Sequence, residues 1–269
     1  MTEIPPPAQP IGVEMKLRKV ELPGDVDRQY QEYVDRIDAR IRKGDDRNDI
    51  CRDALLEVYG EQSSPLAQLH LDPRNVTLEP EYYGDCDPER YYPVKPLLWL
   101  WYMFDRSPAG MNLELGFRLR RMLAQHIFKR VGKNFKCFPF VEFTFGYNME
   151  VGDNVVIHRW VMLDDRGGIE LGDKSSCADF VNVYSHTHDI NLQQFVDNKK
   201  TVIGPRCRVT YHATILAGTK MGENSMLGAS GLLTKDAREH AVYVGIPAKK
   251  VKEKDRDLAE PSKHKEERF

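Results

Sequence analysis

Apolar residues recur at every sixth position through the second half of this chain of 269 residues. Strands alternate faces every two residues and α-helices repeat every 3.6 residues, so neither element alone produces a period of six. A triangular coil of three short strands, about eighteen residues per turn, does produce it, because one residue on each side points at the axis. The inward series are Val151, Ile157 and Leu163, then Leu171, Cys177 and Val183, then Ile203, Val209, Ile215, Met221, Leu227 and Leu233.

A glycine follows an aliphatic residue at regular places in the same region. These elements are VGKN at Val131, VGDN at Val151, LGDK at Leu171, IGPR at Ile203 and MGEN at Met221. Glycine suits a tight corner, and the Asn or Asp beside it tolerates turn conformations. The intervals are 20, 20, 32 and 18 residues, so the third coil carries extra chain. The excess lies between His188 and Thr201, is polar, and predicts a loop that projects from the coil.

Before Val131 the apolar spacing is that of helices, with residues three or four apart on one stripe. It predicts helices over 25–43, 48–59 and 113–131. Residues 61–96 are rich in Pro, Asp and Tyr and are interpreted as irregular. We therefore expect a disordered arm (1–24), a helical and irregular region (25–130), a β-helix domain (131–252) and a charged tail (253–269).

Composition narrows the class of protein. With 41% hydrophobic and 30% charged residues and a net charge of −2, the chain is a soluble globular type with no sign of a nucleic-acid partner. Five cysteines without a CxxC pair disfavour disulfides and favour a cytoplasmic setting, and no signal peptide is recognised. The apolar run 97–104 is shorter than the roughly 20 residues of a membrane span. A peripheral membrane contact through 97–130, which includes a basic helix, stays open.

Two histidines and an aspartate occur in the segment VYSHTHDI at 183–190, directly before the extra chain. Histidine can remove a proton from a hydroxyl at neutral pH because its usual pKa is near 6.5. Two residues apart on a strand, His186 and His188 share one face, so they could instead chelate a metal ion.

Several motifs together resemble the hexapeptide-repeat O-acetyltransferases, which include the maltose, galactoside and nodulation acetyltransferases and enzymes that acetylate surface polysaccharides. The motifs are FGYNMEVGDN at 145–154, LDDRGGIELGD at 163–173, VYSHTHDI at 183–190, GASGLLTKD at 228–236 and VGIPAKKVK at 244–252. The resemblance covers roughly residues 137–252. It implies a left-handed parallel β-helix and a homotrimer that binds acetyl-CoA, the co-substrate, between neighbouring subunits without a metal ion.

The same resemblance implies roles for particular residues. His188 matches the general base, and the backbone N–H of Tyr211 matches the donor to the oxyanion of the transition state. Positions expected at the acceptor are His158, Asp164, Asp165 and His186, with the choice between the two aspartates left open. Positions expected at the cofactor are Ala229, Thr234, Lys235, Lys249 and Lys252, the last two near the phosphates.

The sequence thus predicts an acetyl-CoA-dependent O-acyltransferase that acetylates a hydroxyl of a sugar or glycan precursor by direct transfer. Residues 208–210 read Arg-Val-Thr where the family has a Trp-Ile-Gly that packs beside the cofactor. Tyr211 stands where the family has Gly or Ser, and its side chain would narrow the cofactor slot. Two other classes remain open. One is a metal enzyme similar to γ-carbonic anhydrases that uses His158, His186, His188 and His212. The other is a non-catalytic β-helix scaffold.

Overall fold

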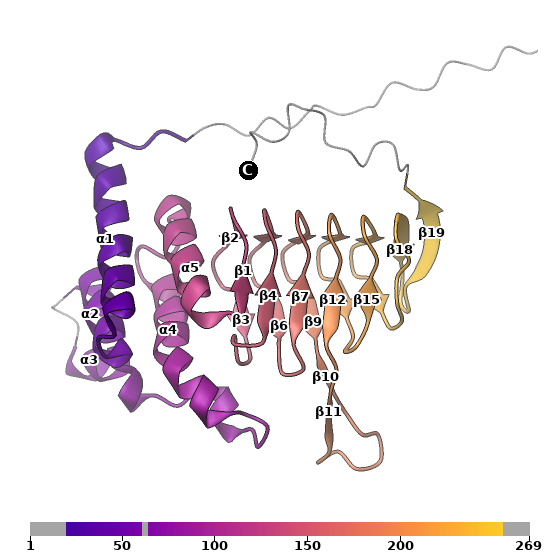
Figure 1. Cartoon of the computed structure of the whole chain (residues 1–269), viewed down its shortest axis with the longest axis horizontal. Helices are drawn as coiled ribbons and strands as arrows, with labels where there is room; N and C mark the ends of the chain where they lie inside the picture. The colour runs from indigo at the N-terminus through magenta and orange to yellow at the C-terminus, as the bar shows by residue number, and fades with distance from the viewer. Residues whose placement is uncertain (1–19, 61–63, 255–269) are drawn as a thin grey trace, which may run out of the picture.

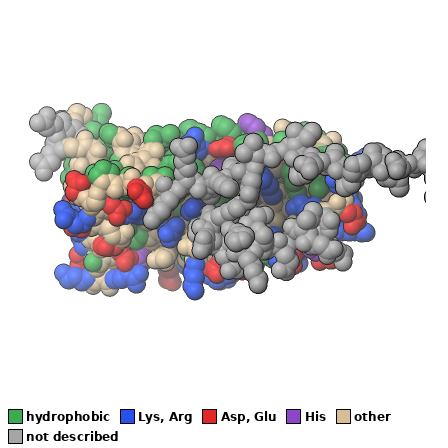
Figure 2. Space-filling view, turned by 90° about the horizontal axis from the view of Figure 1, so that it is seen from above, with side chains coloured by type: hydrophobic (Ala, Val, Ile, Leu, Met, Phe, Trp, Pro, Cys, Tyr) green, Lys and Arg blue, Asp and Glu red, His purple; other side chains and the backbone are tan. Residues whose placement is uncertain are grey.

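The computed structural model describes residues 20–60 and 64–254, in which a helical region and a β-helix lie end to end (Figure 1). Most of the predicted arm and nearly all of the predicted tail lie outside the described residues. Seen from above, hydrophobic side chains run along one long edge of the molecule (Figure 2). Within the described ranges, no helix combines the length and the apolarity that crossing a membrane requires.

The helical region confirms two predicted helices to within one residue and shortens the third. The helix predicted to reach residue 131 ends at Ile127, because Arg130 and Val131 already form the first strand of the β-helix. The helices are α1 (Gly24–Lys43), α2 (Arg47–Tyr59), α3 (Pro65–Leu71), η1 (Pro73–Asn75), η2 (Glu79–Tyr82), α4 (Pro88–Arg106) and α5 (Leu113–Ile127).

The interpretation of residues 61–96 as irregular was wrong, because α3 and the first half of α4 fall there. Pro93 and Pro96 lie inside α4. Each removes an N–H that would have bonded the carbonyl four residues earlier. Those carbonyls belong to the exposed residues Glu89 and Tyr92, where water can replace the missing donor. Burial of the following apolar run, including Trp101, then stabilises the helix.

Part of the segment for which membrane contact stayed open, residues 97–130, packs against the protein itself. The apolar side chains of the run that are buried are Leu97, Leu98, Leu100, Trp101 and Phe104. In α5, the buried Arg120 donates from Nε to Asp105 at 2.8 Å, and Arg121 donates to the carbonyl of Phe135 at 2.8 Å. These apolar and basic side chains therefore bind other parts of the chain.

The β-helix is left-handed, has about six turns and consists of three parallel sheets. Sheet A holds β1 (Arg130–Val131), β4 (Met149–Val151), β7 (Ile169–Leu171), β12 (Thr201–Ile203) and β15 (Lys220–Met221). Sheet B holds β2 (Lys136–Cys137), β5 (Val156–Ile157), β8 (Ser176–Cys177), β13 (Arg208–Val209), β16 (Met226–Leu227), β18 (Ala241–Val244) and the antiparallel β19 (Lys249–Glu253). Sheet C holds β3 (Glu142–Phe143), β6 (Met162–Asp164), β9 (Asn182–Tyr184), β14 (Thr214–Ile215) and β17 (Leu232–Leu233).

The positions predicted to point at the axis do so. Val151 pairs in register with Leu171, which pairs in register with Ile203, and all three are buried completely. The fold predicted from the six-residue period is therefore confirmed. The helical region covers the first coil, since the ring of Trp101 in α4 lies 5.2 Å from that of Phe143 in β3. The two regions thus share one hydrophobic core.

Two edges of the triangular coil matter for the site. The BC corner joins sheet B to sheet C through residues 138–141, 158–161, 178–181, 210–213 and 228–231. The CA corner joins sheet C to sheet A through residues 144–148, 165–168, 185–200, 216–219 and 234–236. Sheet C lies between these two corners.

Candidate active site at the projecting hairpin

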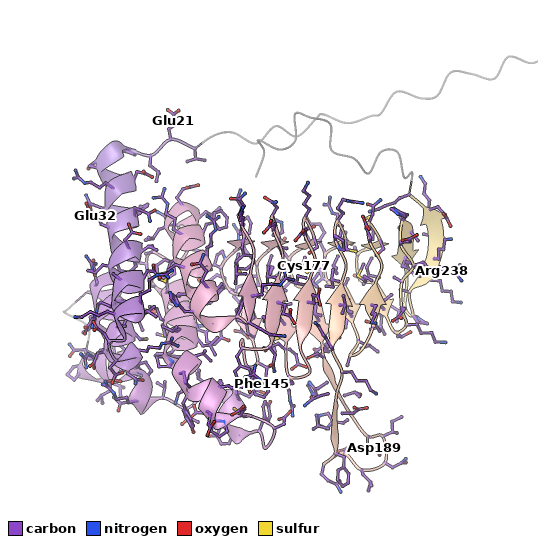
Figure 3. The ribbon with its side chains drawn as sticks, in the orientation of Figure 1. Glu21, Glu32, Phe145, Cys177, Asp189 and Arg238 are labelled. Carbon is purple, nitrogen blue, oxygen red and sulfur yellow. The ribbon has the colours of Figure 1, made fainter. Side chains whose placement is uncertain are left out.

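The extra chain of the third coil forms an antiparallel hairpin of β10 (His186–His188) and β11 (Val196–Asn198) that projects from the CA corner (Figure 1). His186 pairs with Asn198 and His188 with Val196. Figure 3 shows Asp189 far out on this hairpin, away from the coil that carries Cys177. The predicted projecting loop is thus a hairpin, and both histidines lie on its first strand.

His186 is held by an aspartate of the preceding coil. Its Nδ1 contacts Oδ2 of Asp164, whose side chain is buried. The other oxygen of this carboxylate accepts a hydrogen bond of 2.9 Å from the hydroxyl of Thr144, one coil earlier again. The contacts follow from the register of sheet C, which pairs Asp164 with Tyr184 and so stacks successive coils at this corner. The orientation of the His186 ring is thereby set from inside the β-helix.

His188 is exposed, and its ring meets that of His186 edge to face at 5.4 Å. Its Nδ1 lies 2.7 Å from the carbonyl oxygen of Gln193 in the same hairpin. A carbonyl oxygen only accepts, so Nδ1 must carry the proton and Nε2 has a free lone pair when the ring is neutral. This is the tautomer that a general base requires, with the basic nitrogen directed away from the hairpin backbone.

Asp165 has different surroundings from its neighbour Asp164. It is buried completely and accepts hydrogen bonds from the backbone N–H groups of Phe145 at 2.7 Å and Asn148 at 3.1 Å. Burial raises the pKa of Asp165 to about 6, although these N–H groups favour its charged form. Its carboxylate holds the turn at 145–148, whereas that of Asp164 meets a histidine of the hairpin.

Three expected site residues lie at the BC corner instead. Tyr211 and Ala229 are exposed there, and His158 stacks on Phe138 at 4.6 Å. Burial lowers the pKa of His158. Sheet C separates these residues from His188, so a single chain does not bring them together with the hairpin.

The remaining expected cofactor residues lie beyond the hairpin along the β-helix. Thr234 and Lys235 are exposed at the CA corner of a later coil. Lys249 and Lys252 are exposed on β19, which pairs with β18 at the end of the β-helix. Thr234 and Lys235 thus share the corner of His188, whereas the two terminal lysines lie on sheet B.

Comparison with known proteins finds acetyltransferases, although no family model matches the chain. Galactoside O-acetyltransferase of Escherichia coli K12 is 29% identical over 143 residues, which cover 51% of this chain and 70% of that protein. A crystal structure of maltose O-acetyltransferase from Clostridium difficile 630 superposes with a TM-score of 0.57 at 25% identity, covering 65% of this chain and 92% of that one. A galactoside acetyltransferase in complex with coenzyme A gives a TM-score of 0.56 at 26% identity, covering 65% of this chain and 86% of that one.

The chain is a homologue of the hexapeptide-repeat acetyltransferases. The resemblance recognised in its motifs is therefore confirmed. Those motifs lie between residues 145 and 252, so α4 and η2 carry none of them.

Sequence reasoning missed an aromatic ladder on the BC corner of this acetyltransferase homologue. Phe140 stacks on Trp160 at 4.2 Å, and Phe180 stacks on His212 at 4.8 Å. All four residues have positive φ, which bulky side chains rarely adopt. Trp160 is 47% exposed and Phe180 44%. The sequence does contain a pattern that indicates this ladder, because Phe140, Trp160 and Phe180 are spaced 20 residues apart.

The sequence also did not single out Thr144 or Gln193, whose partners Asp164 and His188 become visible only in three dimensions. His158 and His212 lie at the BC corner, whereas His186 and His188 lie at the CA corner. Among the described residues, no three His, Cys, Asp or Glu side chains form a group that could hold a metal ion.

Proposed function

We propose that the chain is an acetyl-CoA-dependent O-acetyltransferase in which His188 is the general base and a sugar or glycan precursor is the acceptor. Support for the reaction comes from its relatives, among them a galactoside O-acetyltransferase and a galactoside acetyltransferase bound to coenzyme A. The observation that carries the assignment of the base is the contact of His188 Nδ1 with the carbonyl of Gln193. It leaves Nε2 free to accept a proton.

In the proposed reaction, the acceptor hydroxyl oxygen attacks the carbonyl carbon of the acetyl thioester while Nε2 of His188 takes its proton. The new C–O bond forms, the C–S bond breaks, and the coenzyme A sulfur leaves with the proton from His188. Acetyl ester and free thiol are the products, without a covalent acyl-enzyme or a metal ion. His186, oriented by Asp164, is proposed to contact the acceptor.

Tyr211 is proposed to stabilise the oxyanion through its backbone N–H. Two coils earlier, at the position equivalent to Tyr211, the N–H of Arg159 donates to the side chain of Asp179 in the next coil at 3.2 Å. The residue in the corresponding place above Tyr211 is Ala229, which has no acceptor side chain. Within the described ranges no hydrogen bond uses the N–H of Tyr211. It is therefore available to a developing negative charge.

A complete site requires more than one copy of the chain, because His188 and Tyr211 lie at different corners. We propose a cyclic homotrimer in which the CA corner of one subunit faces the BC corner of the next. The aromatic ladder leaves Trp160 exposed on one of these surfaces. On the other surface, at the CA corner, the side chains of Ile190 and Phe195 in the hairpin are 93% and 58% exposed. Apolar patches on both corners are what such a contact would bury.

Acetyl-CoA is proposed to lie in this contact, along the coils beyond the hairpin. Ala229 at the BC corner and Thr234 and Lys235 at the CA corner would line its arm from the two subunits. Lys249 and Lys252 would meet the phosphates, because ammonium groups donate charge-assisted hydrogen bonds to them.

The test is the release of coenzyme A thiol from acetyl-CoA in the presence of sugars, nucleotide sugars and glycosides. We expect His188→Ala to lower kcat about 100- to 10,000-fold. His70→Ala is the matched control, because His70 is exposed on α3 in the helical region. Near-normal turnover in His188→Ala would remove the proposed base. Absence of sugar-dependent release across the whole panel would remove the proposed acceptor class.

A further inference from the structure

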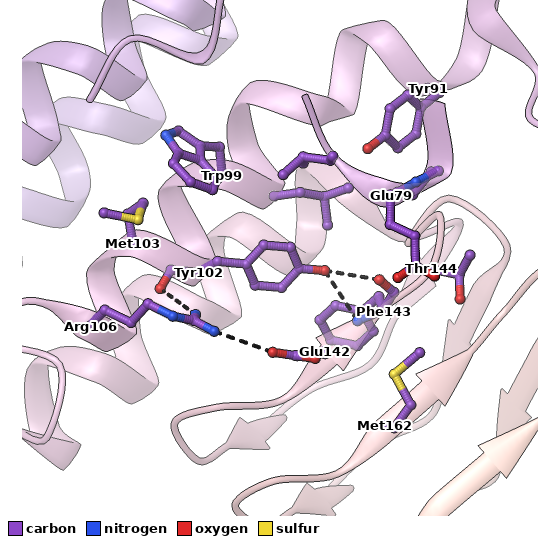
Figure 4. Close-up of a pocket in the computed structure, with 13 residues that line it drawn as sticks. Glu79, Tyr91, Trp99, Tyr102, Met103, Arg106, Glu142, Phe143, Thr144 and Met162 are labelled. Atoms are coloured by element: carbon purple, nitrogen blue, oxygen red, sulfur yellow. Dashed lines mark hydrogen bonds and ion pairs between the residues drawn. The ribbon is translucent and has the colours of Figure 1, made fainter. Parts of the chain in front are cut away.

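A cavity of about 350 Å³ lies between α4, η2 and the outer face of sheet C (Figure 4). Its size is in the range of small-molecule sites, roughly 300–1,000 Å³. Tyr91 and Leu98 of α4 and Phe143 of β3 belong to the buried part of its lining. The cavity thus exists only because the helical region packs against the first coils.

The walls offer ring surface rather than polar atoms. The indole N–H of Trp99 already donates to the carbonyl of His70 at 2.8 Å. The hydroxyl of Tyr102 donates to the carbonyl of Phe143 at 3.0 Å and accepts from its N–H at 3.1 Å. Trp99, Tyr102 and the adjacent Met103 are half-buried and line the cavity. They would contact the flat, apolar face of a ligand.

The rim is polar and carries both signs of charge. Arg106 donates to Glu142 at 3.3 Å across the opening, and the exposed Glu79 lies on the η2 side (Figure 4). Two carboxylates beside one guanidinium disfavour an anionic ligand. The same groups accept from and donate to hydroxyls, so they suit a neutral ligand with a hydroxylated edge.

Tyr91 supplies a polar group without a partner. It is buried, and its hydroxyl has no hydrogen-bond partner among the described residues. In Figure 4 this hydroxyl points towards the space between Glu79 and Trp99. Leaving a buried hydroxyl unpaired costs about 1–3 kcal/mol. A ligand hydroxyl that reached the floor would remove this cost.

The cavity is connected to the hairpin through one side chain. Thr144 lines the cavity and donates to Asp164 at 2.9 Å, and Asp164 contacts His186. Thr144 is two coils before Tyr184 in the register of sheet C. Adjacent strands are about 4.8 Å apart, so the cavity opens within about 10 Å of the coil from which the hairpin departs.

We propose that this cavity, the α4 pocket, is a sugar subsite that binds a neutral pyranose unit of the acceptor other than the unit that is acetylated. A pyranose combines an apolar ring face with a hydroxylated edge, which matches the rings of Trp99 and Tyr102 inside a charged rim. That this sugar is part of the acceptor rests on the proposed function, whereas the binding of a neutral sugar in the α4 pocket does not. The acceptor is then at least a disaccharide, and the α4 pocket selects its non-reacting unit.

The first test measures sugar binding by saturation-transfer NMR with the full chain. The probes are lactose, maltose, cellobiose and the methyl pyranosides of their units. Met103→Trp fills the α4 pocket, and Met111→Trp is the matched control because Met111 is 54% exposed after α4 and does not line the cavity. We expect binding to the wild type and to Met111→Trp, and at least tenfold weaker binding to Met103→Trp.

Circular dichroism and thermal unfolding establish that both variants are folded. Should Met103→Trp fail to fold, Trp99→Phe replaces it, with a several-fold loss of affinity expected from the smaller ring. Equal affinity in the pocket variant and in Met111→Trp would overturn the proposal. So would binding of 1-octanol in place of every sugar, or no binding of any sugar at millimolar concentration.

Activity measurements separate this inference from the proposed function. With a disaccharide acceptor, Met103→Trp should raise KM for the acceptor at least tenfold while KM for acetyl-CoA stays unchanged. If sugars bind in the α4 pocket but no thiol is released, the proposed function fails and the subsite stands. If transfer proceeds with the same acceptor KM in both variants, the subsite fails and the proposed function stands.

Discussion

Nδ1 of His188 lies 2.7 Å from the carbonyl oxygen of Gln193, within one hairpin. The turn that presents this carbonyl is organised by Asp189, whose side chain accepts from the N–H groups of Asn191 and Leu192 at 2.8 Å each. Such a turn is a common use of aspartate, which bonds to backbone two or three residues ahead. Asp189 therefore positions His188 without contacting it through its own side chain.

Asp189→Ala should lower kcat about tenfold, while KM for acetyl-CoA changes little, because the turn loosens and the carbonyl of Gln193 no longer holds Nδ1–H. Nitrogen-15 NMR of the imidazoles should show His188 shifting towards a mixture of tautomers. Asp189→Asn keeps an acceptor oxygen and should restore most of the rate. Asp197→Ala, at an exposed position of β11, is the control. An unchanged tautomer in Asp189→Ala would contradict this role.

Asp164→Ala should destabilise the fold by about 1–3 kcal/mol, because the buried hydroxyl of Thr144 and His186 both lose their acceptor. It should also raise KM for the acceptor more than KM for acetyl-CoA. Urea unfolding and steady-state kinetics measure the two effects. Asp179→Ala serves as the control, since Asp179 accepts from the backbone of Arg159 at the BC corner. Unaltered acceptor KM would show that His186 does not contact the acceptor.

Trp160→Glu should dissociate the proposed trimer, because it places a charge in the aromatic ladder of the BC corner. Light scattering coupled to gel filtration should give three copies of the 31.1 kDa chain for the wild type and one for the variant. Tyr82→Glu is the matched control for Trp160→Glu, since Tyr82 is 80% exposed in the helical region. Transfer should be lost together with the assembly. A monomeric wild type, or a trimeric and fully active variant, would contradict the shared site.

The raised pKa of Asp165 predicts that the stability of the fold depends on pH. Its pKa is raised by burial to about 6 in the folded chain, against about 3.9 when unfolded. Between about pH 4 and pH 6 the unfolded chain therefore loses this proton first, and stability falls as pH rises, by about 3 kcal/mol from this group. Asp165→Asn removes that component, so its stability relative to wild type should increase from pH 4 to pH 7.

Urea unfolding of the two proteins at several pH values measures this difference. Asp197→Asn, at an exposed position, is the control for a general charge effect. A constant difference in unfolding free energy between Asp165→Asn and the wild type across the window would contradict a raised pKa.

The helical region was only partly predictable from the sequence. The apolar stripes that predict α1 and α2 depend only on residues close together in the sequence, and they located both helices to within one residue. In contrast, α4 was missed because Pro93 and Pro96 are unfavourable inside a helix. The compensation comes from residues far away in the sequence, such as Phe143, whose ring packs on Trp101. No local pattern contains that contact.

The sequence alone determined the β-helix, its inward residues and the projecting segment. The reason is that each coil repeats the same local rule, with one apolar residue in six facing an identical neighbour at the next turn. Family motifs likewise marked His188 within a pair of histidines. The tertiary structure decided which aspartate meets the hairpin, because Asp164 and Asp165 are adjacent in sequence but make different contacts. It also placed His188 and Tyr211 at separate corners and created the α4 pocket, because these depend on how distant segments pack.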